Sequence, residues 1–131
     1  MNIPDNLLYT KTHEWAQVND LEVTVGITDY ACGQLNREIV HVELPTVGTK
    51  ARQEESFGAL DAVKASFDLY APVSGEIVAV NKEVIENPTI VGSSPYYDGW
   101  MIKVAMSNPL ELKKLLRPEE YGRLLDSEGS H

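Results

Sequence analysis

Cysteine is almost absent from this chain, which has a single thiol, Cys32, among 131 residues. One cysteine excludes an internal disulfide and suits a reducing compartment. Basic side chains are also scarce, since 11 Lys and Arg stand against 20 Asp and Glu and leave a net charge of −9. We therefore expect no binding to nucleic acid, because affinity for phosphate comes mainly from Lys and Arg. An acidic surface instead favours encounters with basic partner surfaces.

Long hydrophobic runs are missing as well. The longest apolar run falls far short of the roughly 18 residues that a membrane-spanning helix needs. The first residues, MNIPDNLLYTKTHEW, contain neither the basic and apolar regions of a signal peptide nor the Arg- and Ser-rich composition of a transit peptide. We therefore expect a cytoplasmic protein without a membrane span.

The composition is that of one globular domain. Hydrophobic residues make up 43% and charged residues 24% of the chain, which is ordinary for a soluble protein. A chain of 131 residues is long enough for one packed core. We therefore predict a single domain over residues 1–131, with its core from about residue 7 to about residue 125 and a polar C-terminal tail.

Most of the chain has the two-residue periodicity of half-buried strands. In LEVTVGI, residues 21–27, two valines alternate with Glu22 and Thr24, and Asn-Asp at 19–20 provides a turn before them. Pro-Val-Ser-Gly at 72–75 predicts a second tight reversal. The segments with strand character are 21–27, 39–44, 57–63, 69–71, 76–80 and 100–105.

Helix signals before the last quarter of the chain are weak. Thr28 is a candidate N-cap for a short helix over TDYACGQL, and Asn36 could end that helix in a left-handed conformation. Residues 87–88 and 94–99 are rich in Pro, Gly, Asn and Ser, which indicates loops.

The periodicity changes near the C-terminus. Ser-Asn-Pro at 107–109 supplies a cap and a first-turn proline, and leucines at helical spacing follow over 110–116. Pro118 breaks this helix and can start another over EEYGRLL, residues 119–125, before the polar tail. We therefore expect two short C-terminal helices.

Catalytic and metal-binding patterns are absent from the sequence. No GxSxG, phosphate-binding loop or dinucleotide fingerprint occurs. His13, His41 and His131 lie far apart, and none has a His or Cys at metal-ligand spacing. We interpret all three histidines as ordinary and non-ligating. The sequence thus indicates a protein that carries or binds rather than an enzyme, and it predicts no metal site.

One lysine occupies an unusual position. In ESFGALDAVKASFDLYAPVSGEIVAVN, residues 55–81, Lys64 separates two largely apolar runs and precedes the Pro-Val-Ser-Gly turn by eight residues. Lysine rarely interrupts a buried strand. Lys64 is therefore either an ordinary turn residue, with Asp61 as an exposed ion-pair partner of little energetic value, or the residue that the fold exists to present.

Cys32 also allows two interpretations. As a lone cysteine in a short helix, it is most simply a small buried hydrophobic residue, which is the commoner fate of such cysteines. Alternatively, it is a thiol close to the functional group, with its pKa lowered by the positive end of that helix.

Six motifs together resemble one protein family. KTHEWAQVND, VGITDYA, VHVELPTVG, DAVKAS, DLYAPVSGEIVAVN and SSPYYDGWMIKV occur in the order and spacing of the H protein of the glycine cleavage system, from about Leu7 to about Leu125. The resemblance implies a mostly β fold, a lipoyl-domain-like barrel-sandwich hybrid with short C-terminal helices. It also implies that Lys64 lies on a hairpin and carries lipoic acid in amide linkage.

The resemblance further implies that the chain is a non-catalytic carrier. In the family, the lipoyl arm takes an aminomethyl group from glycine decarboxylase to aminomethyltransferase and is reoxidised by dihydrolipoyl dehydrogenase. Such carriage raises the local concentration of the reacting sulfur at each enzyme. A lipoate ligase or lipoyl transferase would attach the cofactor and read Asp61, and Glu14 of the HEW motif would face the loaded arm. We expect the carrier to be a monomer.

Departures from the family pattern cluster near the arm. Residues 61–64 are Asp-Ala-Val-Lys where the family usually has Glu-Ser-Val-Lys, and Phe67 replaces a small residue. The helix end at residues 35–38 is one residue longer than is usual in the family, and a cysteine at position 32 is not usual there. These departures leave two alternatives to the glycine cleavage function open. One is a lipoate-binding paralogue that carries sulfur intermediates for a heterodisulfide-reductase-like complex, with Cys32 near the arm for thiol exchange. The other is an unmodified binding or scaffold module. We place the glycine cleavage function first.

Overall fold

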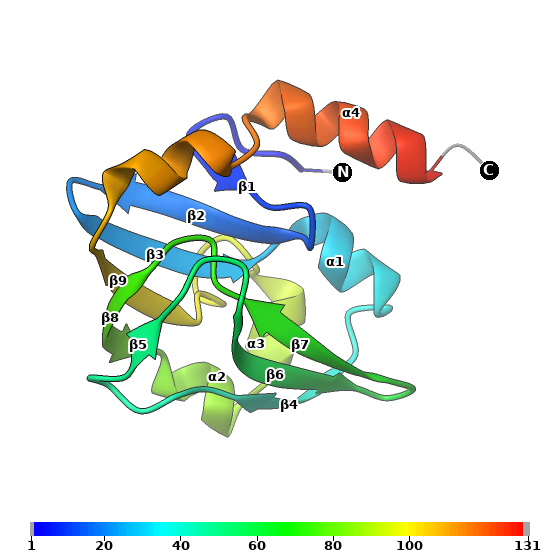
Figure 1. Ribbon diagram of the computed structural model, residues 1–131. Helices are drawn as coiled ribbons and strands as arrows, with labels where there is room; N and C mark the ends of the chain where they lie inside the picture. The colour runs from blue at the N-terminus through cyan, green and yellow to red at the C-terminus, as the bar shows by residue number, and fades with distance from the viewer. Residues whose placement is uncertain (1, 130–131) are drawn as a thin grey trace.

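The structure is a computed structural model that describes residues 2–129 (Figure 1). Antiparallel strands form two sheets with short helices around them, so the expected mostly β architecture is confirmed. The larger sheet has the order β1-β2-β3-β9-β8-β5, with the bounds Leu8–Tyr9, Glu14–Asn19, Glu22–Ile27, Ile102–Met106, Gly75–Val80 and Lys50–Ala51. The smaller sheet has the order β4-β6-β7, with the bounds Ile39–Glu43, Ser56–Ala62 and Ser66–Tyr70.

The larger sheet buries the alternating valines of β3. Val23 and Val25 are fully buried, and they lie opposite Val104 and Ile102 of β9. Such cross-strand pairs of β-branched side chains stabilise an antiparallel sheet. The strand predicted for residues 21–27 is therefore confirmed, and its partner comes from the far end of the chain.

Helix α1 (Asp29–Gln34) follows β3 and leads to the smaller sheet. Its start is as predicted, because the hydroxyl of Thr28 accepts a hydrogen bond from the N–H of Ala31 over 3.2 Å. Two left-handed residues follow the helix, Asn36 with φ 53° and Arg37 with φ 58°. Asparagine tolerates this conformation better than most residues, so the predicted helix end at Asn36 is confirmed.

The helices within residues 2–129 are short, and none is both long and apolar enough to cross a membrane. Two five-residue helices, α2 (Lys82–Glu86) and α3 (Thr89–Ser93), are not apparent from the sequence pattern. Helices this short depend on packing rather than on intrinsic propensity. Here Val84 and Val91 are fully buried in the same core as the smaller sheet, and this burial orders the two helices.

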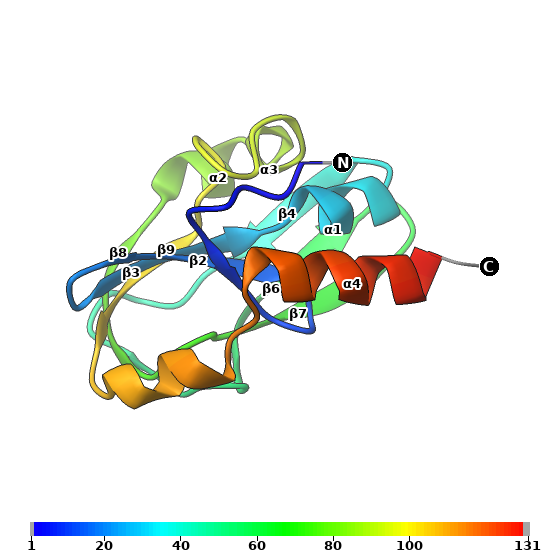
Figure 2. The same cartoon turned by 90° about the horizontal axis from the view of Figure 1, so that it is seen from above.

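The C-terminal segment differs from the expectation in two ways. Its first helix, η1 (Pro109–Lys114), is a 3-10 helix rather than an α-helix. Helix α4 (Pro118–Gly129) starts at the predicted proline, but the expectation that it ends at residue 125 is wrong. The supposed polar tail continues the helix, and Oε1 of Glu128 there lies 3.3 Å from Nε2 of His13. Figure 2 shows α2 and α3 along the upper edge of the molecule, the orange η1 along the lower edge and α4 across the middle, and Figure 1 shows η1 and α4 together along the top. His131 lies outside the described residues.

Candidate functional site

Lys64 lies at the tip of the β6–β7 hairpin, which extends to one side of the molecule in Figure 1. The N–H of Ala62 donates to the carbonyl oxygen of Ala65 over 2.8 Å and closes a tight turn around Val63 and Lys64. Both of these central residues are exposed. The two alanines are small, so the lysine amine is accessible from the solvent.

Buried leucines anchor the base of this hairpin. Leu60 in β6 and Leu69 in β7 are each 2% exposed and belong to the core that also contains Val84 and Val91. Strand β6 also pairs with β4, so the hairpin is part of a three-stranded sheet. A strand with one buried face has a fixed register. Burial of Leu60 and Leu69 and the pairing of β6 with β4 therefore fix the register of the hairpin, while the Lys64 side chain at its tip is exposed.

Asp61 binds Ser66 rather than Lys64, which an ordinary turn would have given it as an ion-pair partner. Within residues 2–129 it forms no ion pair with Lys64. Its Oδ1 instead accepts a hydrogen bond from the hydroxyl of Ser66 over 2.6 Å, directly across the hairpin. The structure therefore gives no support to the simple ion-pair interpretation, and Ser66 orients the carboxylate beside the lysine.

Phe67 contributes an apolar ring to the hairpin surface. It is 46% exposed and lies opposite Leu60 in the pairing of β6 with β7. It does not line the pocket described below. Its departure from the family pattern thus affects the surface that a partner would meet on approaching Lys64.

Glu14 is a buried carboxylate that connects the two sheets. It begins β2 and is only 2% exposed. Its Oε1 accepts hydrogen bonds from the hydroxyls of Thr10, over 2.6 Å, and Thr12, and its Oε2 accepts one from the N–H of Tyr70 in β7 over 3.1 Å. Burial raises the pKa of this carboxyl above its ordinary value, and the three hydrogen bonds oppose that rise. Glu14 is thus a buried acid held in place by three donors.

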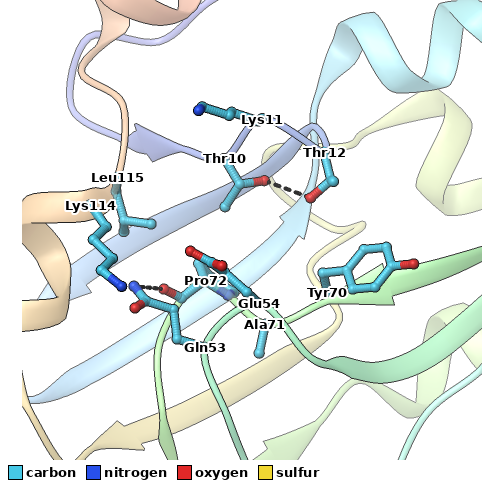
Figure 3. Close-up of a pocket in the computed structure, with 10 residues that line it drawn as sticks. All are labelled: Thr10, Lys11, Thr12, Gln53, Glu54, Tyr70, Ala71, Pro72, Lys114 and Leu115. Carbon is cyan, nitrogen blue, oxygen red and sulfur yellow. Dashed lines mark hydrogen bonds between the residues drawn. The ribbon is translucent and has the colours of Figure 1, made fainter.

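A pocket of about 540 Å³ opens beside this carboxylate (Figure 3). The three residues that donate hydrogen bonds to Glu14 all line it. Lys11 and Lys114 extend from different sides of the opening in Figure 3. The remaining lining residues are Gln53, Glu54, Ala71, Pro72 and Leu115. The pocket is therefore assembled from chain segments that are far apart in sequence.

Strand β7 links the two parts of the site. It starts beside the Lys64 turn and ends at Tyr70, whose N–H binds Glu14. Asp61 and Lys64 thus share the hairpin, and Glu14 of β2 contacts the opposite end of β7. Thr10 and Thr12 were not identified from the sequence. The signal that could have revealed them is their two-residue spacing from each other and from Glu14 within TKTHE.

Cys32 is fully buried in α1, and its thiol donates a hydrogen bond to the carbonyl oxygen of Val91 over 3.4 Å. Burial raises the pKa of this thiol to about 12, against a smaller lowering by the positive charge of Arg37. The expectation of a thiol activated by the helix is therefore wrong, because desolvation of the thiolate outweighs any favourable field. The interpretation of Cys32 as a small buried hydrophobic residue is confirmed.

The histidines form ordinary contacts. His13 hydrogen-bonds the hydroxyl of Tyr121 through Nδ1 over 2.9 Å, and its Nε2 lies 3.3 Å from Oε1 of Glu128. His41 is exposed in β4, opposite Asp61. In the described part of the chain, no group of three or more His, Cys, Asp or Glu side chains could hold a metal ion.

Known proteins share both the sequence and the fold of this chain. The family model described as "Glycine cleavage H-protein" matches residues 7–128. A "Glycine cleavage system H protein" from Carboxydothermus hydrogenoformans is 50% identical over 127 residues, which is 97% of each chain. One from Methylacidiphilum infernorum is 50% identical over 125 residues, which is 95% of this chain and 97% of the relative.

A solved structure agrees with these sequence relatives. The crystal structure of a glycine cleavage system H protein from Mycobacterium marinum superposes with a TM-score of 0.86 at 33% identity, and the match covers 98% of this chain and all of the other. The fold expected from the sequence motifs, a barrel-sandwich hybrid of the lipoyl-domain type, is thereby confirmed. The chain therefore belongs to the glycine cleavage H-protein family.

Proposed function

We propose that this chain is a lipoyl carrier of the glycine cleavage system, with lipoic acid in amide linkage to Nζ of Lys64. The observation that carries the proposal is an exposed lysine on a turn with a buried, paired base, in a member of the H-protein family. When bound, lipoate would supply a disulfide that is reduced as it takes up an aminomethyl group and a dithiol that a dehydrogenase reoxidises after the group has left. The chain itself acts as a non-catalytic subunit that binds, orients and presents this group.

The surroundings of Lys64 fit a covalently attached acid. The residue is exposed, and within residues 2–129 its amine takes part in no ion pair. Acylation removes the positive charge of a lysine, and here that loss leaves no carboxylate without its partner. The small Ala62 and Ala65 on either side leave space for an enzyme that must reach the amine. These features support Lys64 as the attachment site.

Asp61 is assigned to recognition by the lipoate ligase or lipoyl transferase. Its carboxylate is one methylene shorter than that of the glutamate usual in the family. Ser66 donates to Oδ1, and among residues 2–129 no hydrogen bond or ion pair engages Oδ2, which leaves it open to a partner. A hydrogen bond that restricts the side chain lowers the entropy lost when an enzyme binds it. The orientation of Asp61 by Ser66 therefore supports recognition of this aspartate, in place of the usual glutamate, by the enzyme that attaches lipoate.

Glu14 is assigned to holding the ammonium of the loaded arm. A carboxylate whose pKa is raised by burial gains strongly from an approaching cation, because pairing favours its charged form. Thr10, Thr12 and Tyr70 hold both carboxylate oxygens in advance, so little reorganisation is needed. The adjacent pocket gives the cargo a place that is partly shielded from water.

The proposed partners are the enzymes of the glycine cleavage system, namely glycine decarboxylase, aminomethyltransferase and dihydrolipoyl dehydrogenase. A net charge of −9 suits docking on basic surfaces. The relatives named above give no support to the sulfur-carrier alternative, and burial of Cys32 removes its structural argument. A cytoplasmic monomer stays a prediction.

The attachment site is tested by intact-mass measurement after co-expression with a lipoate ligase. We expect one lipoyl adduct on the unmutated chain, loss of the adduct in Lys64→Ala, and its retention in Lys113→Ala, which removes an exposed lysine elsewhere. An adduct that persists in Lys64→Ala would refute the site. The absence of any adduct would favour the unmodified scaffold module. Glycine-dependent reduction of the arm with the decarboxylase, against an ordinary H protein as a control, then tests the cargo.

A further inference from the structure

The turn that supplies the threonine donors to Glu14 ends at His13, and this residue is held in place by its neighbours. Thr10 to His13 connect β1 to β2, and the N–H of His13 donates to the carbonyl oxygen of Thr10 over 3.1 Å. His13 has a φ of 72°, a left-handed conformation that side chains larger than glycine adopt at a cost. A non-glycine residue in this conformation persists where surrounding contacts enforce it.

Those contacts come largely from helix α4. Nδ1 of His13 is 2.9 Å from the hydroxyl of Tyr121, and Nε2 is 3.3 Å from Oε1 of Glu128. The ring of Tyr30 in α1 lies against the imidazole, with centroids 4.8 Å apart. The carbonyl oxygen of His13 accepts a hydrogen bond from the N–H of Thr28 over 3.0 Å. Backbone and side chain of His13 are thus both engaged.

Helix α4 is firmly placed where it meets His13. Tyr121 is fully buried and stacks on Tyr9, with ring centroids 4.5 Å apart and planes within 4°. Its hydroxyl is 2.7 Å from Oγ1 of Thr28. If Thr28 donates to Tyr121 and Tyr121 donates to Nδ1 of His13, the remaining imidazole proton on Nε2 points to Glu128. One neutral tautomer therefore satisfies the whole chain of groups.

We propose that His13 is a positioning residue that couples helix α4 to the buried carboxylate of Glu14. Its side chain is fixed by α4, its backbone fixes the turn, and the turn aims the hydroxyls of Thr10 and Thr12 at Oε1 of Glu14. The C-terminal helix thereby sets the protonation and orientation of the cargo-binding acid without touching it. The coupling itself is independent of the proposed function, and only the role of Glu14 in binding the cargo rests on it.

The coupling is tested by following the carboxyl carbon of Glu14 in NMR pH titrations of the full, unmodified chain. His13→Asn is the main variant, because asparagine tolerates the left-handed conformation but is too short to keep both contacts with α4. Tyr121→Phe removes only the hydroxyl and keeps the stacked ring. Thr12→Val removes one donor directly and serves as the positive reference. Val84→Ala destabilises a distant part of the core and serves as the control for stability alone.

We expect His13→Asn and Thr12→Val to raise the pKa of Glu14 above that of the unmutated chain, since hydroxyl donors favour the ionised form. Tyr121→Phe should shift it in the same direction by less, and Val84→Ala should lower stability without a shift. An unchanged titration of Glu14 in both His13→Asn and Tyr121→Phe would overturn the proposal, whatever their stability. Because lipoate is not present in this measurement, its result is independent of whether Lys64 is the attachment site.

Discussion

Replacing Glu14 with glutamine should make the protein more stable at neutral pH while impairing it as a carrier. Burying a carboxylate costs several kcal/mol before its hydrogen bonds are counted, and Glu14 is 2% exposed. Three donors offset much of this cost, each by about 1.5–3 kcal/mol for a charged acceptor. Burial raises the pKa of Glu14 in spite of these bonds, so we expect desolvation to be the larger effect. Glutamine can accept from Tyr70 and donate to the threonine hydroxyls, so the contacts can be kept.

The size of the gain follows from linkage. The folded-state pKa of Glu14 lies above its ordinary value of 4.5, so the folded protein binds this proton more tightly than the unfolded chain does. Stability is therefore lost as pH rises from about 4.5 through the folded-state pKa. Each unit of such a rise costs about 1.4 kcal/mol. We therefore expect Glu14→Gln to raise the free energy of unfolding at pH 7, by that amount for each unit by which the folded-state pKa of Glu14 exceeds 4.5.

Urea unfolding of both proteins over a pH series measures this difference. We expect it to be near zero below pH 4.5, where both side chains are neutral, and to grow as the pH rises toward neutrality. Glu43→Gln, at an exposed position of β4, should show no such growth. A Glu14→Gln protein that is less stable at pH 7, or a difference that does not depend on pH, would show that hydrogen bonding outweighs desolvation and that the reasoning is wrong.

Three further outcomes follow from the packing. Gly75→Ala should destabilise the fold by about 3 kcal/mol or more in urea unfolding, because its Cβ would lie 2.0 Å from the carbonyl oxygen of Ala105. Cys32 should resist a thiol reagent such as DTNB in the native protein and react fully in urea, and rapid native reaction would contradict its burial and its pKa of about 12. Leu60→Ala should cost about 2–5 kcal/mol, yet Lys64 should still be lipoylated wherever the variant is folded; unchanged stability would argue against the hairpin anchor.

Local signals in the sequence were enough to predict several elements. The alternation in 21–27 identified β3, and Thr28 and Asn36 marked both ends of α1, because strand periodicity and helix caps act within a few residues. Strand β2 was not predicted, because its first three residues are all buried and its last three are all exposed. A strand with that pattern shows no alternation.

The residues of the candidate site also differ in whether local sequence is enough to predict their surroundings. Lys64 and Asp61 occur within one short motif, so their neighbourhood could be predicted from the chain itself. The partner of Glu14 on β7 could not, because Tyr70 reaches Glu14 only after the two sheets pack together. The activated-thiol alternative for Cys32 fails for a similar reason. A helix end suggests a lowered pKa, but burial by α3 decides the outcome, and α3 has no clear sequence signal.

The isolated β-bridge between Tyr9 and Leu116 can form only after the smaller sheet has been synthesised. The three strands of the smaller sheet lie within residues 39–70, and three strands with a buried face are enough for a sheet to begin to form. The edge at Tyr9, by contrast, waits for Leu116, which is synthesised after all three of those strands. The Lys64 turn therefore precedes the finished pocket, which needs Leu115. Under the proposed function, a nascent chain would expose its attachment lysine before the pocket for the cargo is complete.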